Sequence, residues 1–330
     1  MAGQLFVTNT LGGFYSALNL SKELRMGVQA TSKFRQFSDV RDAFSKVQRS
    51  GQTFTWDGVP MMTRANRALV ETNTIPQGNH TVYQSTLTMS ERGFSVAYTG
   101  ALEAMAMVSV RQPIMKVLKY DAMVDIDCAV HAQFNNTAIR AASTGTAVNV
   151  TLTSNSSATL TVTDNIGQVQ WRSVVDEMKG RNIPFYDGKS YWSIARPLAY
   201  RLMKNQLEAV HQYTETGLEM IMNGEIGRYE DTRSVEQTVV PRGGATNSTT
   251  FNAFTDTSDN WDTGGDWVFF FGEDTVCEAV HTEEEIRAKN PDDFGRSKGI
   301  AWYALLGFGI THNDSNNLAQ SRIVKFDSAA

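Results

Sequence analysis

The sequence predicts an α+β protein with one long helix and many short strands. Three observations lead to this class. A helical pattern runs for nearly thirty residues, from Pro113 to about Ala142. Residues 51–92 are rich in Thr, Gln and β-forming side chains interrupted by turn residues, a pattern typical of strands. Apolar segments of strand length return from Trp267 onward.

The composition is that of a globular protein. The 330 residues are 41% apolar and 20% charged, with 25 Gly and 7 Pro, which excludes disordered, collagen-like and disulfide-rich chains. This length allows one elaborate domain or two modest ones with a sizeable core.

We expect a soluble intracellular product. The longest near-continuous apolar stretch, residues 299–310, has twelve residues, whereas about twenty are needed to span a bilayer. The N-terminus lacks the basic and apolar regions of a signal peptide. Cys128 and Cys277 stand far apart, which favours a reducing compartment over a disulfide framework.

The charge is distributed unevenly along the chain. Residues 1–70 contain nine Lys or Arg and four Asp or Glu, a net charge of +5. The whole chain has a net charge of −5, so residues 71–330 carry −10. Residues 208–293 contain nineteen acids and five bases, a net charge of −14. A basic arm before an acidic body suggests docking on a neighbouring copy or on a nucleic acid. Two solvated faces that never meet explain the same charges equally well.

The N-terminal part of the chain has an irregular pattern. We predict an extended arm over residues 1–50, with one short helix around Asp39–Val47. Residues 51–92 predict two long strands with a broad loop between them, which together form a projecting hairpin. Such a hairpin has few apolar pairs and is marginally stable alone, so it needs a surface to lie on.

The long helix is predicted to begin with Pro113 at its first position and to end before Ser143. Its apolar surface is wider than one stripe, so we expect it to pack on more than one side. The remaining predicted elements are a polar hairpin at 146–164, a helix at 167–179 followed by a strand pair, helices from about 196 and at 206–222, a surface loop at 241–266, and strands at 94–98, 267–271, 276–280, 300–310 and 322–326.

No group of residues has a catalytic or metal-binding pattern. Residues 295–299 read GRSKG, but a nucleophile elbow needs a strand before the serine and a helix after it, and Ser297 has neither. The five histidines stand alone, without metal-ligand spacing. Asp121 and Asp125, one helical turn apart, are expected in salt bridges more than at an ion. We expect no enzyme, no cofactor and no metal.

Three segments together resemble the major capsid proteins of tailed bacteriophages. They are NIPFYDGKSYWSIARPLAYRLMKN at 182–205, NGEIGRYEDTRSVEQTVV at 223–240 and GRSKGIAWYALLGFGI at 295–310. They follow a projecting hairpin and a long helix in this order, and the likeness extends over roughly residues 50–326. The fold is shared with encapsulins and with the floor of the herpesvirus capsid.

The resemblance implies an architecture for the whole chain. Residues 1–50 would be an N-terminal arm and 51–92 the extended loop, or E-loop, that reaches over an adjacent subunit. Residues 93–164 and 291–330 would form the peripheral domain, with a spine helix at about 113–142. Residues 165–290 would form the axial domain around the fivefold and sixfold axes.

The function implied is self-assembly into the icosahedral shell, in pentamers and hexamers, that encloses a phage double-stranded DNA genome without sequence-specific binding. The protein would be part of the virion, assembled in the host cytoplasm, with a separate scaffolding protein, a portal and a decoration protein as partners. Candidate intersubunit contacts are Lys33, Arg35, Arg41, Trp56, Arg64, Arg67 and Glu71.

Some relatives crosslink their shells through a lysine in the extended loop. This chain has no lysine between Lys46 and Lys116, so we expect a shell held by non-covalent contacts or a cement protein. Two other classes stay open: an encapsulin-type nanocompartment shell with the same fold, and a ligand-binding protein or enzyme built on the Thr-rich strands.

Overall fold

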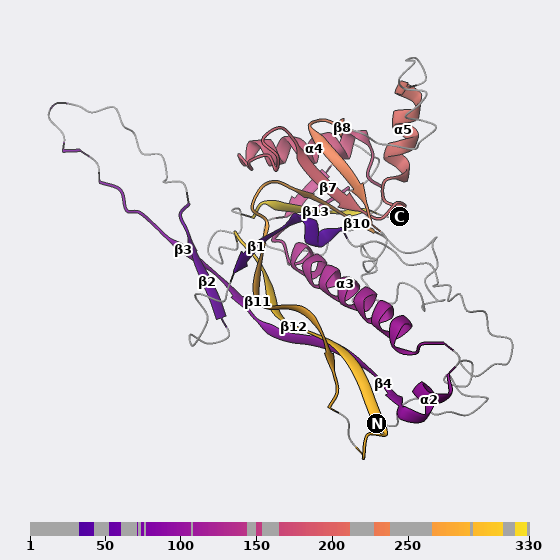
Figure 1. Ribbon diagram of the computed structural model, residues 1–330. Helices are drawn as coiled ribbons and strands as arrows, with labels where there is room; N and C mark the ends of the chain where they lie inside the picture. The colour runs from indigo at the N-terminus through magenta and orange to yellow at the C-terminus, as the bar shows by residue number, and fades with distance from the viewer. Residues whose placement is uncertain are drawn as a thin grey trace.

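The computed structural model describes residues 33–42, 53–60, 71, 74, 75, 77–106, 108–143, 150–153, 165–211, 228–237, 266–290, 293–312 and 321–328; at 40–42, 150–153 and 208–211 it describes the backbone only. These residues form an α+β fold with two larger sheets, a long helix and a projecting two-stranded hairpin (Figure 1). No helix in these ranges is long and apolar enough to cross a membrane.

The longest strands form a four-stranded sheet in the order β1–β11–β12–β4. β11 (Val276–Ala288) and β12 (Ser297–Ile310) are an antiparallel pair, and β4 (Ser90–Thr99) lies antiparallel on the other side of β12. β1 (Ser38–Asp42) lies parallel to β11. The predicted helix over 39–47 is therefore wrong at residues 39–42, because this backbone pairs with β11; residues 43–47 lie outside the described part.

A seven-stranded mixed sheet has the order β6–β5–β13–β10–β7–β9–β8. The bounds are β5 (Ile139–Ser143), β6 (Val150–Thr153), β7 (Tyr191–Ala195), β8 (Arg228–Tyr229), β9 (Thr232–Glu236), β10 (Asp266–Phe271) and β13 (Ile323–Ser328). Central strand β10 is buried along its whole length, as expected for a strand covered on both faces. Phe269 and Phe271 belong to the core beneath the long helix, whereas Phe270 belongs to the core on the other face.

The long helix α3 (Arg111–Asn135) packs between the two sheets, and its buried side chains Ile114, Leu118, Ile126, Val130 and Phe134 recur at helical spacing (Figure 1). The same core contains residues of β4, β12 and β10. The short helix α2 (Gly100–Met105) joins β4 to this region, with the Thr99 hydroxyl accepting a hydrogen bond from the Leu102 amide.

The predicted bounds of the long helix are wrong at both ends. Pro113 is the third helical residue and not the first, which is still allowed because the first four amides of a helix have no intrahelical acceptor. The helix stops at Asn135, and residues 139–143 form β5 parallel to β13. The apolar side chain of Val117 on this helix is exposed.

Two further helices cover the outer face of the seven-stranded sheet. α4 (Gln168–Gly180) agrees with its prediction and buries Trp171 and Met178. α5 (Arg201–His211) starts later than the predicted start near 196, since residues 197–200 form turns, and it continues without a break through residue 206, where a second helix was predicted to begin; residues 212–222 lie outside the described part. A 3₁₀ turn, η2 (Phe34–Phe37), precedes β1.

His131 is a buried core residue of α3, and its environment predicts a fold that loses stability in acid. It is 3% exposed, stacks on Trp267 and contacts the edges of Phe34 and Phe269. Burial lowers the pKa of His131 to about 3, and Lys325 and Arg196 add to this effect. The unfolded chain binds a proton here below about pH 6.5, whereas the folded chain does not until about pH 3.

We therefore expect the free energy of unfolding to fall by about 3 kcal/mol between pH 6.5 and pH 4 through His131 alone. Urea unfolding of the subunit across this range measures the loss. The variant His131→Phe should lose less stability over the same interval. An unchanged pH dependence in this variant would mean that other groups cause the acid sensitivity.

Candidate assembly surface

The hairpin is built from β2 (Thr53–Gly58) and β3 (Tyr83–Thr88), paired antiparallel from Thr53–Thr88 to Gly58–Tyr83. Burial alternates along β3, so Tyr83, Ser85 and Leu87 lie against the body while the residues between them are exposed. Every described residue from Glu71 to Val82 is exposed, and this part of the hairpin extends away from the body (Figure 1).

The base of the hairpin is fixed on the four-stranded sheet. Phe54, Leu87 and Met89 form a small core with Ala279 of β11. The Trp56 indole nitrogen donates a hydrogen bond of 2.8 Å to the Thr311 carbonyl oxygen. The close approach depends on Gly307, where an added Cβ would lie 2.6 Å from the Thr88 carbonyl oxygen. The hairpin therefore leaves the body from a fixed root.

A chain of polar contacts continues this root. The Tyr83 hydroxyl lies 2.5 Å from His312 Nδ1, and His312 Nε2 lies 2.9 Å from an Asp274 carboxylate oxygen. If Nε2 carries the proton and donates to Asp274, Nδ1 accepts from the Tyr83 hydroxyl, so one histidine tautomer satisfies both contacts. The contacts tie β3 to the turn between β10 and β11.

The segment before β1 is anchored in the body as well. Phe34 packs edge-on against Phe134 and Phe269, and Phe37 packs against Phe271. The Asp127 carboxylate on α3 is fully buried. It accepts hydrogen bonds from the Arg35 amide (3.0 Å), the Lys33 amide (3.3 Å) and the Gln237 side chain (2.7 Å). Burial raises the pKa of Asp127, while these bonds oppose the rise.

The described end of the arm is thus part of its own subunit. The Arg35 guanidinium donates to the buried Glu278 carboxylate at 2.7 Å and also contacts Glu284, both in β11. Arg35 was a candidate for contact with a neighbouring copy; the ion pairs that the structure gives it are intramolecular. The backbone of Ser38–Asp42 also pairs with β11 of the same subunit.

The structure describes the side chains of only some of the other candidate residues. Lys33 is half-buried beside η2, Trp56 is half-buried against its own subunit, and Glu71 is exposed on the hairpin. Arg41 lies in β1, but its side chain is outside the described part, as are Arg64 and Arg67 altogether. Their contacts with other subunits stay a prediction.

No role for Asp127 and no contact among Tyr83, His312 and Asp274 could be predicted from the sequence. Asp125, two residues from Asp127, points the other way and forms a salt bridge with Arg92 at 2.8 Å, as expected for a surface carboxylate. Asp121 accepts a hydrogen bond from the Trp302 indole at 2.7 Å. Within the described ranges no group of three or more His, Cys, Asp or Glu side chains is arranged to hold a metal ion.

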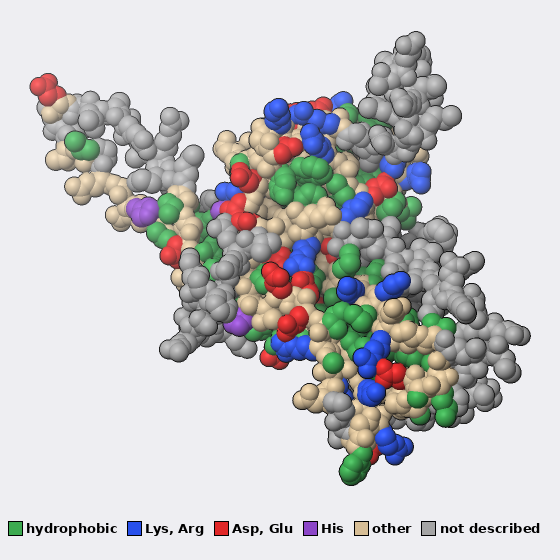
Figure 2. All heavy atoms as spheres, viewed as in Figure 1, with side chains coloured by type: hydrophobic (Ala, Val, Ile, Leu, Met, Phe, Trp, Pro, Cys, Tyr) green, Lys and Arg blue, Asp and Glu red, His purple; other side chains and the backbone are tan. Residues whose placement is uncertain are grey.

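Large apolar side chains are exposed on the hairpin and on the body. Val59, Ile75 and Val82 on the hairpin are more than half exposed, at 63%, 70% and 55%. Phe94 of β4 and Met123 of α3 are also exposed. Figure 2 shows hydrophobic side chains on the projecting hairpin and across the face of the body. Exposed apolar patches are common at interaction surfaces, so the projecting hairpin is a candidate for contact with another molecule.

Comparisons with known proteins identify the fold. No protein-family model matches the chain, and no curated protein matches its sequence. Solved structures do match. The head structure of Helicobacter pylori bacteriophage KHP40 has a TM-score of 0.67 at 11% identity, with 95% of each chain covered.

Two further structures are similar over nearly the full length. The capsid of Cyanophage P-SCSP1u gives a TM-score of 0.65 at 13% identity and covers 95% of this chain and 93% of its own. The capsid of Ralstonia phage GP4 gives 0.63 at 15% identity, with coverage of 96% and 95%. The chain has the fold of bacteriophage capsid proteins, as the resemblance predicted.

Proposed function

We propose that this chain is the major capsid protein of a tailed bacteriophage and that many copies assemble into an icosahedral shell. The observation that supports this most strongly is the match to phage capsid structures over about 95% of both chains. The exposed hairpin fits the same function, because its apolar side chains need a neighbouring copy to cover them.

The role is structural, without catalysis. Copies associate as pentamers and hexamers, and closed symmetry makes the sum of weak contacts strong. The shell encloses double-stranded DNA without reading its sequence and becomes part of the virion after assembly in the host cytoplasm. A separate scaffolding protein, a portal and a decoration protein are the partners that such a shell uses.

Negative-stain microscopy and light scattering test the proposal, first on the protein expressed alone and then with its neighbouring genes. Hollow shells tens of nanometres across are expected. Small oligomers under both conditions would contradict shell formation and favour a ligand-binding protein. An enzyme enclosed in purified particles would favour a cellular nanocompartment with the same fold.

Reversing two charges on the hairpin loop should block assembly. We expect the double variant Arg64→Glu, Arg67→Glu to form no shells, because the reversed charges would repel the carboxylates that we propose the two arginines meet on another copy. Circular dichroism checks the fold, and light scattering checks assembly. Normal shells from this variant would rule out a role for the two arginines.

A further inference from the structure

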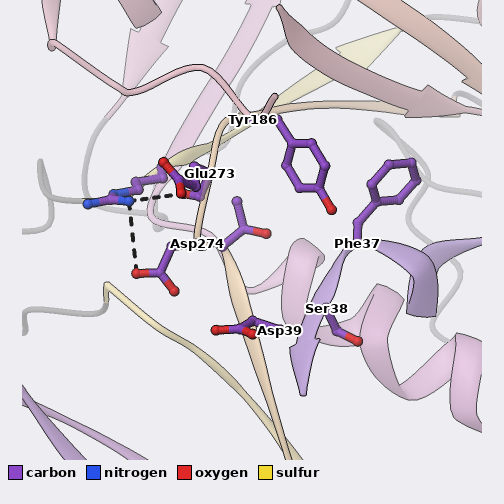
Figure 3. Close-up of a pocket in the computed structure, with 8 residues that line it drawn as sticks. Phe37, Ser38, Asp39, Tyr186, Glu273 and Asp274 are labelled. Atoms are coloured by element: carbon purple, nitrogen blue, oxygen red, sulfur yellow. Dashed lines mark hydrogen bonds and ion pairs between the residues drawn. The ribbon is translucent and has the colours of Figure 1, made fainter. Parts of the chain in front are cut away.

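A groove of about 580 Å³ lies where β1, the turn after β10 and the loop before β7 meet. It is lined by Phe37, Ser38, Asp39, Tyr186, Glu273 and Asp274 (Figure 3) and also by Thr275 and Arg322. Asp274 also lies at the root of the hairpin, through its contact with His312. The groove is therefore next to the place where the hairpin leaves the body.

The groove is anionic. Asp39, Glu273 and Asp274 contribute three carboxylates, and Arg322 contributes the single guanidinium. Arg322 donates to the backbone carbonyl of Glu273 at 3.1 Å and lies 3.9 Å from the Asp274 carboxylate. Within the described residues, the Glu273 carboxylate is exposed and makes no hydrogen bond or ion pair. The net charge of −2 favours a cationic occupant.

A buried hydroxyl gives a second, independent sign of an occupant. Thr275 lines the groove, is 2% exposed, and its hydroxyl oxygen has no hydrogen-bond partner among the described residues. A buried polar group without a partner is costly, and nearly all such groups in folded proteins are satisfied. An N–H donor that enters the groove would give the Thr275 hydroxyl oxygen a hydrogen-bond partner.

The walls of the groove fit a guanidinium better than an ammonium. The rings of Phe37 and Tyr186 flank it (Figure 3). A guanidinium is planar, stacks on aromatic rings and offers several N–H donors at once, so it can meet carboxylates and a hydroxyl together. Arginine is therefore the expected side chain.

The chain itself supplies such a side chain. Residues 61–70, the loop of the hairpin, contain Arg64 and Arg67 and no acidic residue, a net charge of +2. The described part of this hairpin extends away from the body of its own subunit (Figure 1). We propose that the groove of one subunit binds Arg64 or Arg67 from the hairpin loop of a second copy, an inference that rests on the proposed shell assembly.

Charge reversal with rescue tests the proposal. The variant Glu273→Lys should lower the yield of shells by roughly tenfold or more, because it places a positive charge where the arginine binds. Glu283→Lys is the matched control: it makes the same charge change at an exposed position of β11 outside the groove and should assemble normally. Combining Glu273→Lys with Arg64→Glu or with Arg67→Glu should restore shells in one combination, which identifies the bound arginine.

The buried hydroxyl provides a second measurement. Thr275→Val should leave the Tm of the isolated subunit unchanged or raise it, since it removes an unpaired hydroxyl, while it lowers assembly. Normal shells from both Glu273→Lys and Thr275→Val would overturn the inference, as would failure of both rescue combinations. Failure of the wild-type chain to form shells would contradict the proposed function instead, so the two failures are distinguishable.

Discussion

Replacing Asp127 with alanine is expected to lower the free energy of unfolding of the subunit by about 3 kcal/mol. Three donors lose their acceptor: the amides of Lys33 and Arg35 and the side chain of Gln237. Each buried donor left unpaired costs about 1–3 kcal/mol, and removal of the desolvated carboxylate offsets part of the sum. Urea unfolding of the isolated subunit measures the change.

Asp125→Ala is the matched control for this experiment. Asp125 lies on the same helix, but its carboxylate is 41% exposed and pairs with Arg92 at the surface. A surface pair contributes less than about 1 kcal/mol, so the control should lose little stability. Equal losses in the two variants would show that Asp127 does not hold the arm segment. If only Asp127→Ala lowers the stability, Asp127 holds the arm segment in place. Its replacement would then release η2 from the core and expose Phe34 and Phe37.

The sequence predicts well those elements whose pattern is local. The long helix has apolar residues at helical spacing, and the hairpin strands have β-forming residues bounded by turns, so both are recovered. The segments 39–42 and 139–143 are not recovered. Their local residues fit a helix, and they become strands by parallel pairing with β11 and β13, which come much later in the chain.

The candidate assembly surface was also predictable only in part from the sequence. Basic residues in the arm and loop are visible in the sequence, whereas the partner of each depends on distant elements. Arg35 meets Glu278 only because β1 lies beside β11. Asp127 looks like any polar helix residue, since its partners are mostly backbone amides, which have no sequence pattern. Only the folded structure assigns their roles.

Gly307 shows why spacing seen in a sequence needs the structure before it has a physical meaning. The Gly-x-Gly pattern of β12 is part of the resemblance to capsid proteins, and the structure explains it: β3 crosses β12 at this point. An added Cβ at Gly307 would lie 2.6 Å from the Thr88 carbonyl oxygen and 2.8 Å from a Leu87 methyl group. Neither the backbone of β3 nor the packed Leu87 can move away without loosening the base of the hairpin.

We therefore expect Gly307→Val to destabilise the subunit by about 2–3 kcal/mol and to abolish shell formation, because the hairpin loses its fixed direction. Gly299→Ala on the same strand is the control, since its nearest contact is an ordinary 3.4 Å from the Val96 carbonyl oxygen. Thermal unfolding measures stability, and microscopy measures assembly. If Gly307→Val forms normal shells, the hairpin works without a fixed root, and its direction must come from the neighbouring subunit that covers it.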